Sequence, residues 1–218
     1  MEHEIWLTPG GGAMFRGYRL GFLLALLCVS CRSLAEDKGS TNVRWVVSVF
    51  NDAEVDAVSL ARGEGQAAKI LRRAQVDLTF LECKHGGSAR CLQPDDGHFS
   101  LRVVRRSQNL RSEAFGVAFL DEVGHGTQAD VFFDEVQRLS ANTKVDVSEL
   151  LGHVIAHELG HLILGSYAHS ASGIMSPRWE AAELNQLSKG NLLFNSEQGE
   201  VMLKRMRTMV AFEAASLR

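Results

Sequence analysis

The sequence of 218 residues predicts an α+β fold in a single domain. Short valine-rich segments, bounded by polar turns, alternate with longer segments of helical periodicity. One long apolar segment, residues 146–164, is predicted as a buried helix, and an amphipathic segment near the end of the chain is predicted as a closing helix. No repeat, low-complexity linker or second domain interrupts this order.

The amino-terminal half supplies the predicted strands. Residues 43–50 are rich in valine and alternate weakly, which is typical of a strand. Residues 52–74 follow as a helix, whose apolar stripe is clearest from residue 65 to residue 73. Four later segments have the composition of strands, namely residues 76–83, 99–105, 114–120 and 129–133.

The helix predicted at residues 146–164 has a start signal and a stop signal. Asp146, with Glu149 three residues later, has the form of a capping box. Gly165 stands where a helix commonly ends on a left-handed residue. The closing helix is predicted at residues 196–214, with an apolar side made by Val201, Leu203, Met206, Met209, Val210 and Phe212.

A possible metal site lies in the second half of the long helix. His157 and His161 are four residues apart, so both face one side of the helix and can bind one ion. Glu158 is rotated by roughly 100° from His157, which places its carboxylate beside the ion rather than on it. The sequence therefore predicts a zinc site in which Glu158 is the general base.

Two histidines leave such a site one ligand short, because catalytic zinc usually takes three protein ligands and keeps one open position. Beyond Gly165 the chain reaches His169, and then a short turn that contains Met175. The alternative third ligand is a glutamate from a following helix, for which Glu180 and Glu183 are at suitable distances. The sequence favours His169, because the glutamates leave both His169 and the methionine turn unexplained.

These residues together resemble the metzincin clan of zinc endopeptidases, and within it archaemetzincins and related small bacterial proteins. The clan pattern is H-E-x-x-H-x-x-G-x-x-H followed by a turn with methionine. This chain has one additional residue on each side of the glycine. Carried over by position, His157, His161 and His169 would bind zinc, Glu158 would be the general base and Met175 would form the turn.

The resemblance implies a zincin-like domain, in which a twisted mixed β-sheet is backed by helices and an active-site helix is followed by the Met-turn and a C-terminal helix. It also implies a zinc metalloendopeptidase that hydrolyses peptide bonds. Substrate is expected along an edge strand formed by residues 124–130 and the strand after them, near Gly126. Pro177 and Trp179 are expected to wall the pocket for the side chain after the cleaved bond.

The remaining histidines are predicted to have structural or surface roles. His153 lies one turn before His157, too far along the helix axis to share its ion. It is expected to be buried and to bond a neighbouring strand, or else to support a metal ligand. Three further histidines lie in loops or at strand edges: His85, His98 and His125.

The amino terminus resembles a secretory signal peptide, residues 1–35. A basic stretch that begins at Met14 precedes an apolar run at residues 20–29, and small residues end the segment. This run is too short to cross a membrane of ~30 Å, so no stable anchor is expected. A secreted or periplasmic domain of residues 36–218 is therefore predicted. A start of translation at Met14 and lipidation at Cys31 remain alternatives.

Charge and cysteine content restrict the class of partner. The formal net charge is −3, which does not favour a nucleic-acid partner. Cys83 and Cys91 bracket a polar loop rich in glycine, so a disulfide between them is expected in an oxidising compartment. A monomer that acts on a peptide or protein is predicted, and the short stretch before the first strand predicts no inhibitory propeptide.

Two other functions fit parts of the sequence. A secreted zinc protein could bind a peptide or partner without cleaving it, although Glu158 would then have no purpose. An endoribonuclease of the kind with three histidines in a row is the other alternative, but its motif lacks a glutamate at this position.

Overall fold

The computed structural model describes residues 45–87, 91, 98–105 and 114–216, with side chains described as far as residue 209. The chain divides into two units, residues 1–40 and 41–218, and the fold below belongs to the second. The predicted signal peptide, including Met14 and Cys31, lies outside the described residues. Within the described part, no helix has the length and apolar character needed to span a membrane.

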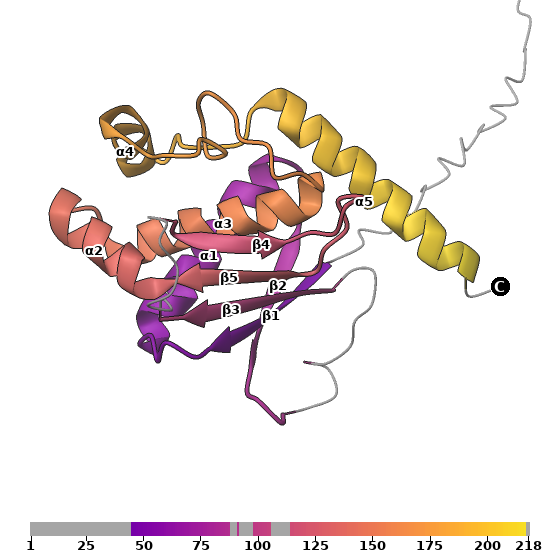
Figure 1. The fold of residues 1–218 in the computed structure, drawn as a ribbon, viewed down its shortest axis with the longest axis horizontal. Coiled ribbons are helices and arrows are strands. Elements are labelled where there is room, and N and C mark those ends of the chain that lie inside the picture. Colours follow the sequence, from indigo (N-terminus) through magenta and orange to yellow (C-terminus); the bar gives the residue numbers. More distant parts are fainter. Residues whose placement is uncertain (1–44, 88–90, 92–97, 106–113, 217–218) are drawn as a thin grey trace, which may run out of the picture. The chain divides into compact units, whose positions relative to one another are not determined.

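The core of the fold is a five-stranded sheet with the strand order β2-β1-β3-β5-β4 (Figure 1). The first four strands in this order run parallel, and β4 pairs antiparallel with β5 at one edge. The mixed sheet confirms the predicted α+β fold. The strands are β1 (Trp45–Asn51), β2 (Leu78–Cys83), β3 (His98–Val104), β4 (Gly116–Phe119) and β5 (Gln128–Phe132).

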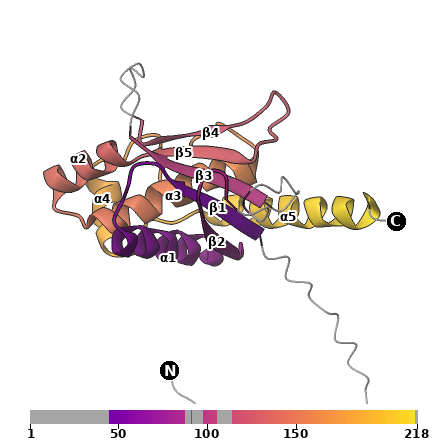
Figure 2. The same cartoon turned by 90° about the horizontal axis from the view of Figure 1, so that it is seen from below.

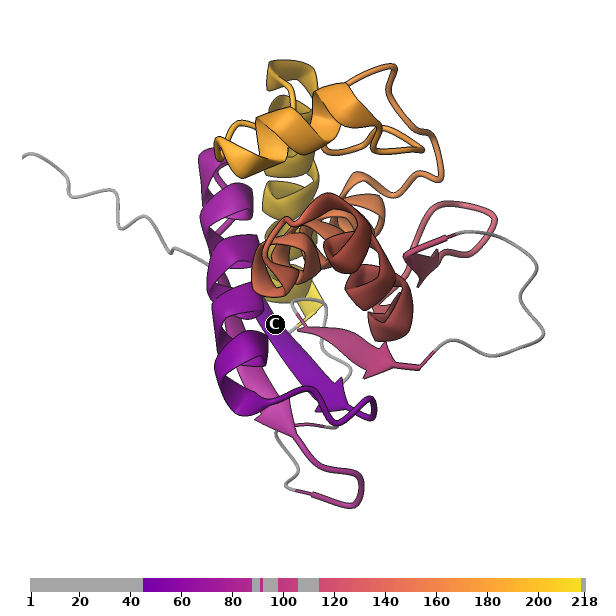
Figure 3. The same cartoon turned by 90° about the vertical axis from the view of Figure 1, so that its left-hand side faces the viewer.

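Helix α3 (Val147–Leu164) contacts α1, α2, α4, α5 and the strands β4 and β5, so it lies at the centre of the packing. Helices α1 and α3 lie side by side over one face of the sheet (Figure 2). In the view of Figure 3, α4 lies on the far side of α3 from the sheet, and α5 passes behind α3. The other helices are α1 (Ala57–Arg73), α2 (Phe133–Thr143), α4 (Ala181–Ser188) and α5 (Ser196–Ser216).

Alternate residues of the central strands supply the sheet side of the hydrophobic core. Trp45 of β1 stacks on Phe99 of β3 with ring centroids 5.2 Å apart. Val47, Leu101 and Val131 are completely buried on the same face. Burying a side chain of this size contributes about 1.5–3 kcal/mol to stability relative to leaving it in water.

The ends of α3 are those that the sequence predicts. The Asp146 carboxylate accepts hydrogen bonds from the backbone N–H groups of Ser148 (2.9 Å) and Glu149 (3.2 Å), which caps the first turn. Gly165 ends the helix with a φ of 63°, a left-handed conformation that glycine adopts without strain. At Gly152, a Cβ atom would lie 2.6 Å from the carbonyl oxygen of Gly63, so α1 and α3 cross at very close range.

The structure confirms all five predicted strands, the three predicted helices and the Cys83–Cys91 disulfide, and it corrects two features. The sequence did not predict α2 or α4. It also placed the edge strand near the metal at residues 124–130 and the strand after them, which was wrong. That strand is β5, which lies between β3 and β4, so β4 is the edge strand on this side of the described sheet and β2 is the edge strand on the other.

Candidate metal centre and catalytic cleft

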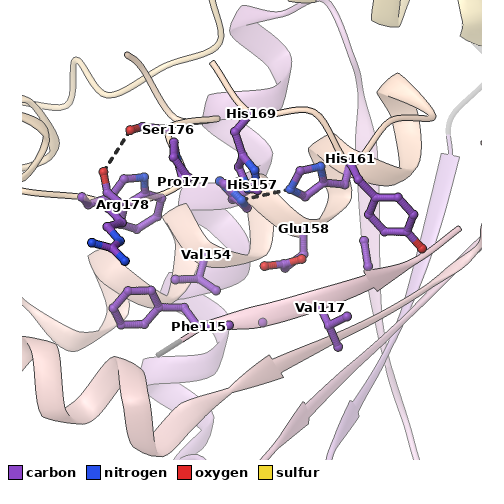
Figure 4. Close-up of a pocket in the computed structure, with 15 residues that line it drawn as sticks. Phe115, Val117, Val154, His157, Glu158, His161, His169, Ser176, Pro177 and Arg178 are labelled. Carbon is purple, nitrogen blue, oxygen red and sulfur yellow. Dashed lines mark hydrogen bonds between the residues drawn. The ribbon is translucent and has the colours of Figure 1, made fainter. Parts of the chain in front are cut away.

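Three histidines meet beside α3, as the sequence predicts. His157 and His161 come from the helix, and His169 comes from the irregular segment after it (Figure 4). One ring nitrogen from each lies within 4.8 Å of the others, and no other group of this kind occurs among the described residues. The Nε2 atoms of His157 and His161 are 3.1 Å apart. Two ligand nitrogens on a tetrahedral zinc ion lie roughly 3.3 Å apart, so the pair fits one ion.

Backbone carbonyls fix the protonation of both helical histidines. The Nδ1 atom of His157 lies 2.7 Å from the carbonyl oxygen of Ile174, and that of His161 lies 2.7 Å from the carbonyl oxygen of Ser166. A carbonyl can only accept, so each Nδ1 must carry the proton and each Nε2 must present a lone pair. Two lone pairs that face each other at 3.1 Å repel, and a cation between them removes this repulsion.

Burial favours the neutral form of these rings, which is the form that binds metal. Burial lowers the pKa of His157 to about 4, against the opposing effect of its bond to the Ile174 carbonyl. Burial also lowers the pKa of His161. At neutral pH, neither ring needs to lose a proton before it can act as a ligand.

The segment beyond Gly165 returns His169 to the helix through a short turn. The backbone N–H of Ser176 donates to the carbonyl of Gly173 at 3.0 Å, and Met175 lies within this turn, fully buried. The Met175 carbonyl in turn accepts from the N–H of Ser170, the residue after His169. The predicted methionine turn is therefore present, and it is tied to the position of the third histidine.

The alternative glutamate ligands belong to a different feature. Glu183 lies in the first turn of α4, and its carboxylate accepts a hydrogen bond from the backbone N–H of Glu180 at 3.1 Å. Neither glutamate belongs to the group of side chains around His157. The structure thus brings His169, and neither Glu180 nor Glu183, to the two helical histidines.

Glu158 lies next to the three histidines and faces the edge strand (Figure 4). It is 5% exposed, and burial, together with the charge of Asp130, raises its pKa to about 8. A Cβ atom at Gly116 of β4 would lie 2.7 Å from the Glu158 carboxylate oxygen Oε1. Because Gly116 has no side chain, the space beside β4 is free for the Glu158 carboxylate.

A cleft of about 280 Å³ opens over Glu158 and the histidines. Pro177 and Trp179 line it, as the sequence predicts for the substrate pocket. Gly126 does not line it; Gly126 lies in the β4–β5 loop, where an added Cβ atom would lie 2.0 Å from the carbonyl oxygen of Phe119. Among the described residues, the lining comes from β4 and the residues before it, from α3, and from the segment after α3: Ala114–Ala118, Val154, His157, Glu158, His161, Tyr167, His169 and Ser176–Trp179.

Trp179 connects the pocket wall to the metal site. Its indole N–H donates to the Ile174 carbonyl at 3.2 Å, the oxygen that also orients His157. The indole ring stacks on Phe115 with centroids 6.2 Å apart and meets the ring of His157 edge-on at 6.0 Å. The wall of the cleft and the ring of a proposed ligand therefore share one acceptor.

Tyr167 is a cleft residue to which the sequence assigned no role. Its hydroxyl donates to the carbonyl of Leu120 at 2.9 Å and accepts from the N–H of Leu120 at 2.8 Å. A tyrosine between two proposed ligands signals a residue near the metal. Its bonds to Leu120 cross 47 residues of sequence, so no local pattern could predict them.

His153 is buried, as expected, but its predicted partner was wrong. Its Nδ1 atom lies 2.7 Å from the Glu149 carbonyl of its own helix instead of bonding to a strand. Its Nε2 atom has no partner among the described residues, and the ring meets Trp179 edge-on at 6.2 Å. The other three histidines of the described residues pair with nearby polar groups, His85 with Asp52, His98 with Ser48 and His125 with Asp121.

Comparisons with known proteins give similarity in fold only. No family model matches the sequence, and no curated protein matches it. The crystal structure of archaemetzincin from Methanopyrus kandleri is similar with a TM-score of 0.49 and 17% identity, over 76% of this chain and 97% of that one. A zinc-dependent peptidase from Methanocorpusculum labreanum is similar with a TM-score of 0.49 and 13% identity, over 72% of this chain and 99% of that one.

Both structures share 17% identity or less with this chain, so the function proposed below rests on the side chains of this chain.

Proposed function

We propose that this protein is a zinc-dependent endopeptidase. The observation that supports this most directly is the convergence of His157, His161 and His169 beside the buried carboxylate of Glu158. Three imidazole ligands and one carboxyl group that is not a ligand are the set that metal-assisted hydrolysis needs. A zinc ion bound there would supply Lewis-acid chemistry, acidifying a water molecule and polarising the carbonyl of the substrate.

The side chains of the cleft supply the remaining steps. Beside a zinc cation the ionised form of Glu158 would be favoured against the effect of burial, and the carboxylate would then take a proton from the attacking water and deliver it to the departing amine. Its burial keeps solvent away from this transfer. His157 and His161 keep their orientation because the carbonyls of Ile174 and Ser166 hold their Nδ1 protons.

A peptide substrate would extend the sheet at β4. This strand is an edge of the described sheet, and its residues Gly116–Ala118 line the same cleft as Glu158. An extended peptide can form main-chain hydrogen bonds with such an edge, which gives affinity with little dependence on side chains. Pro177 and Trp179 would then contact the substrate side chain that follows the cleaved bond, as proposed from the sequence.

The place of action is proposed from the sequence and the disulfide. The predicted signal peptide would export residues 36–218 to the cell exterior or the periplasm, and the Cys83–Cys91 disulfide fits an oxidising compartment. The proposed substrate is a peptide or protein. The protein itself is proposed to be a monomer that binds no nucleic acid and has no stable membrane anchor. Amino-terminal sequencing of exported protein, which should begin at Glu36, tests the leader.

The Glu158→Gln variant tests the catalytic proposal. Glutamine keeps the size of the side chain but cannot accept the proton, so turnover of a peptide library should fall by roughly 10²–10⁴-fold. Zinc content should remain that of the wild type, because Glu158 is not one of the three ligands. Glu149→Gln is the matched control on the same helix, where the side chain is exposed, and it should keep full turnover.

A zinc protein that binds peptides without cleaving them is the competing function. Zinc-loaded wild type that captures peptides from the library and releases them uncut would support it. Turnover in the wild type that Glu158→Gln does not reduce would instead contradict the role of this carboxylate.

A further inference from the structure

The free edge of β4 ends after two residues. The N–H of Phe132 donates to the carbonyl of Phe115 at 2.8 Å, and the antiparallel register continues from this pair along β4. In an antiparallel pair, alternate residues direct both backbone groups to the partner strand. Phe115 and every second residue after it therefore face β5, whereas Gly116, Ala118 and Leu120 face away from the sheet.

Tyr167 already occupies the last of these three positions. Its hydroxyl accepts from the N–H of Leu120 and donates to the carbonyl of Leu120. These are the two hydrogen bonds that a residue of an added strand would make there. An incoming peptide can thus pair with Gly116 and Ala118, but it meets the tyrosine at Leu120.

Both the segment that carries Tyr167 and the loop that follows its partner Leu120 are fixed by other contacts. Tyr167 directly follows Ser166, whose carbonyl holds the ring of His161. The loop after β4 is fixed to α5, because Arg205 donates to the carbonyl of Gly124 at 3.0 Å. Gly124 also packs so closely on Gly165 that a Cβ atom there would overlap the Gly165 carbonyl.

The position of Glu158 relates this boundary to the cleaved bond. Its carboxylate packs against Gly116, so the substrate residue that carries the reacting carbonyl lies opposite Gly116. Antiparallel pairing has the better hydrogen bonds, and in that direction the substrate residues before the cleaved bond run toward Leu120. The first three of them lie opposite Gly116, Val117 and Ala118.

We propose that Tyr167 is a specificity-determining residue that ends the substrate cleft, so that this protein recognises three residues on the amino-terminal side of the cleaved bond. The proposal rests on the proposed peptidase function. A longer chain leaves the strand at Tyr167, and its fourth and fifth residues add no main-chain bonds. Suitable substrates are therefore peptides or chain ends that can turn away from the sheet after three residues.

A ladder of peptides tests this. Each peptide has the same single cleavable bond and the same carboxyl-terminal side, with one to six residues before the bond. For zinc-loaded wild type, kcat/KM should rise up to the third residue and then stay level within about twofold. In Tyr167→Ala the groups of Leu120 become free, and two additional hydrogen bonds should raise the ratio of kcat/KM for five residues over three by roughly tenfold.

The ratio between two peptides is independent of the fraction of active protein, so a partly unstable variant still gives an answer. Val123→Ala, a change at an exposed side chain in the loop between β4 and β5, should keep the wild-type ratio. Tyr167→Phe keeps the ring but loses both bonds, and its ratio should lie between those of wild type and Tyr167→Ala.

Three results would overturn the inference while the peptidase function stands: a steady rise in the wild type through the fifth residue, a length limit in a carboxyl-terminal ladder instead, or an unchanged ratio in Tyr167→Ala. Failure of zinc-loaded wild type to cleave any peptide of either ladder would contradict the proposed function, and this inference with it.

Discussion

The two halves of the candidate metal centre are built differently. His157 and His161 stand on α3, a helix capped at both ends and buried over most of its length. Their separation is a property of helical geometry and depends on nothing outside the helix. His169 stands on a segment without regular structure, and its ring is exposed.

Contacts from distant parts of the chain hold the second half in place. The N–H of Ile174 donates to the carbonyl of Leu193 at 3.0 Å, and Tyr167 bonds the backbone of Leu120. The backbone positions of the helical half are therefore specified locally, whereas the half beyond Gly165, which also orients the ring of His157 through the carbonyl of Ile174, depends on the completed fold. This difference predicts that the two halves respond unequally to substitution.

Removal of one ligand from each half should give the largest effects. His157→Ala should lower zinc affinity by more than about 100-fold, because a ligand oriented by a carbonyl is lost. The loss of zinc affinity in His169→Ala should be roughly tenfold smaller than the loss in His157→Ala, because the exposed ring of His169 is less firmly positioned. Zinc titration against a competing chelator measures both, with His125→Ala as a control at an exposed histidine.

Equal losses in the two variants would show that the loop orients its ligand as firmly as the helix does. Unchanged zinc affinity in His169→Ala would remove this residue from the site.

A methyl group placed between the two halves should have an intermediate effect. A Cβ atom at Gly160 would lie 2.7 Å from a ring carbon of Phe194 and 2.8 Å from the sulfur of Met175. Gly160→Ala should therefore lower the free energy of unfolding by about 1–3 kcal/mol, as overpacking does. The matched control is Gly65→Ala in α1, where nothing lies within 4 Å, and it should raise stability by about 0.5–1 kcal/mol.

Denaturant unfolding with zinc removed gives both values. A neutral or stabilising Gly160→Ala would mean that the methionine turn yields easily to α3, and the contrast between the two halves would then be weaker.

The smallest expected effect depends on pH and lies outside both halves, in α1, the helix that packs against α3. Glu64 of α1 has one carboxylate oxygen that is buried without a partner in the described structure, and burial, with the charge of Glu82, raises its pKa from 4.5 to about 7. Between these pH values the folded chain keeps a proton that the unfolded chain has released. Stability should therefore fall as pH rises from about 4.5 to 7.

Glu64→Gln should remove its own contribution to this slope, with a gain on the order of 1 kcal/mol above pH 7, since partial exposure of the carboxyl reduces the effect. The contribution of Glu158, whose pKa is also raised, should remain. Unfolding curves measured from pH 4 to pH 8 would show it. Glu82→Gln should flatten the slope only in part, because burial is the larger cause. A slope that Glu64→Gln leaves unchanged would assign it to another group.

The sequence predicted the elements whose signals are local. All five strands appeared within a few residues of their predicted bounds, and α3 matched at both ends because Asp146 and Gly165 are recognisable caps. His157, Glu158 and His161 followed from helical spacing, and His169 and Met175 came from the resemblance to a known motif. The structure places all five together.

Two helices were missed because their signals are weak. Helix α2 begins directly after β5 with Phe132 at its cap position and no side-chain cap, so no turn residue separates strand from helix. Its acidic first turn, with Asp134 and Glu135, was the available signal. In α4, the pair Glu180 and Glu183 was considered as metal ligands. The carboxylate of Glu183 instead accepts a hydrogen bond from the backbone N–H of Glu180.

The order of the strands was beyond the reach of the sequence. Both β4 and β5 are short, and nothing in either one says which of them pairs with β3. The wrong choice of edge strand also misplaced Gly126, which lies outside the cleft. The bonds of Tyr167 and Ile174 were hidden for a related reason, since they join segments whose separation only the finished fold reveals.

The carbonyl oxygen of Ile174 makes the chemical centre and the selectivity pocket mechanically dependent on each other. It receives one N–H from a proposed ligand, His157, and one from a pocket wall, Trp179, so both of its lone pairs are engaged. A substrate side chain that displaces the indole of Trp179 changes the position and electric field of the Ile174 carbonyl, which orients the imidazole of His157. Affinity for a substrate residue and reactivity toward its bond are therefore not separate quantities in this cleft, because they meet at a single atom.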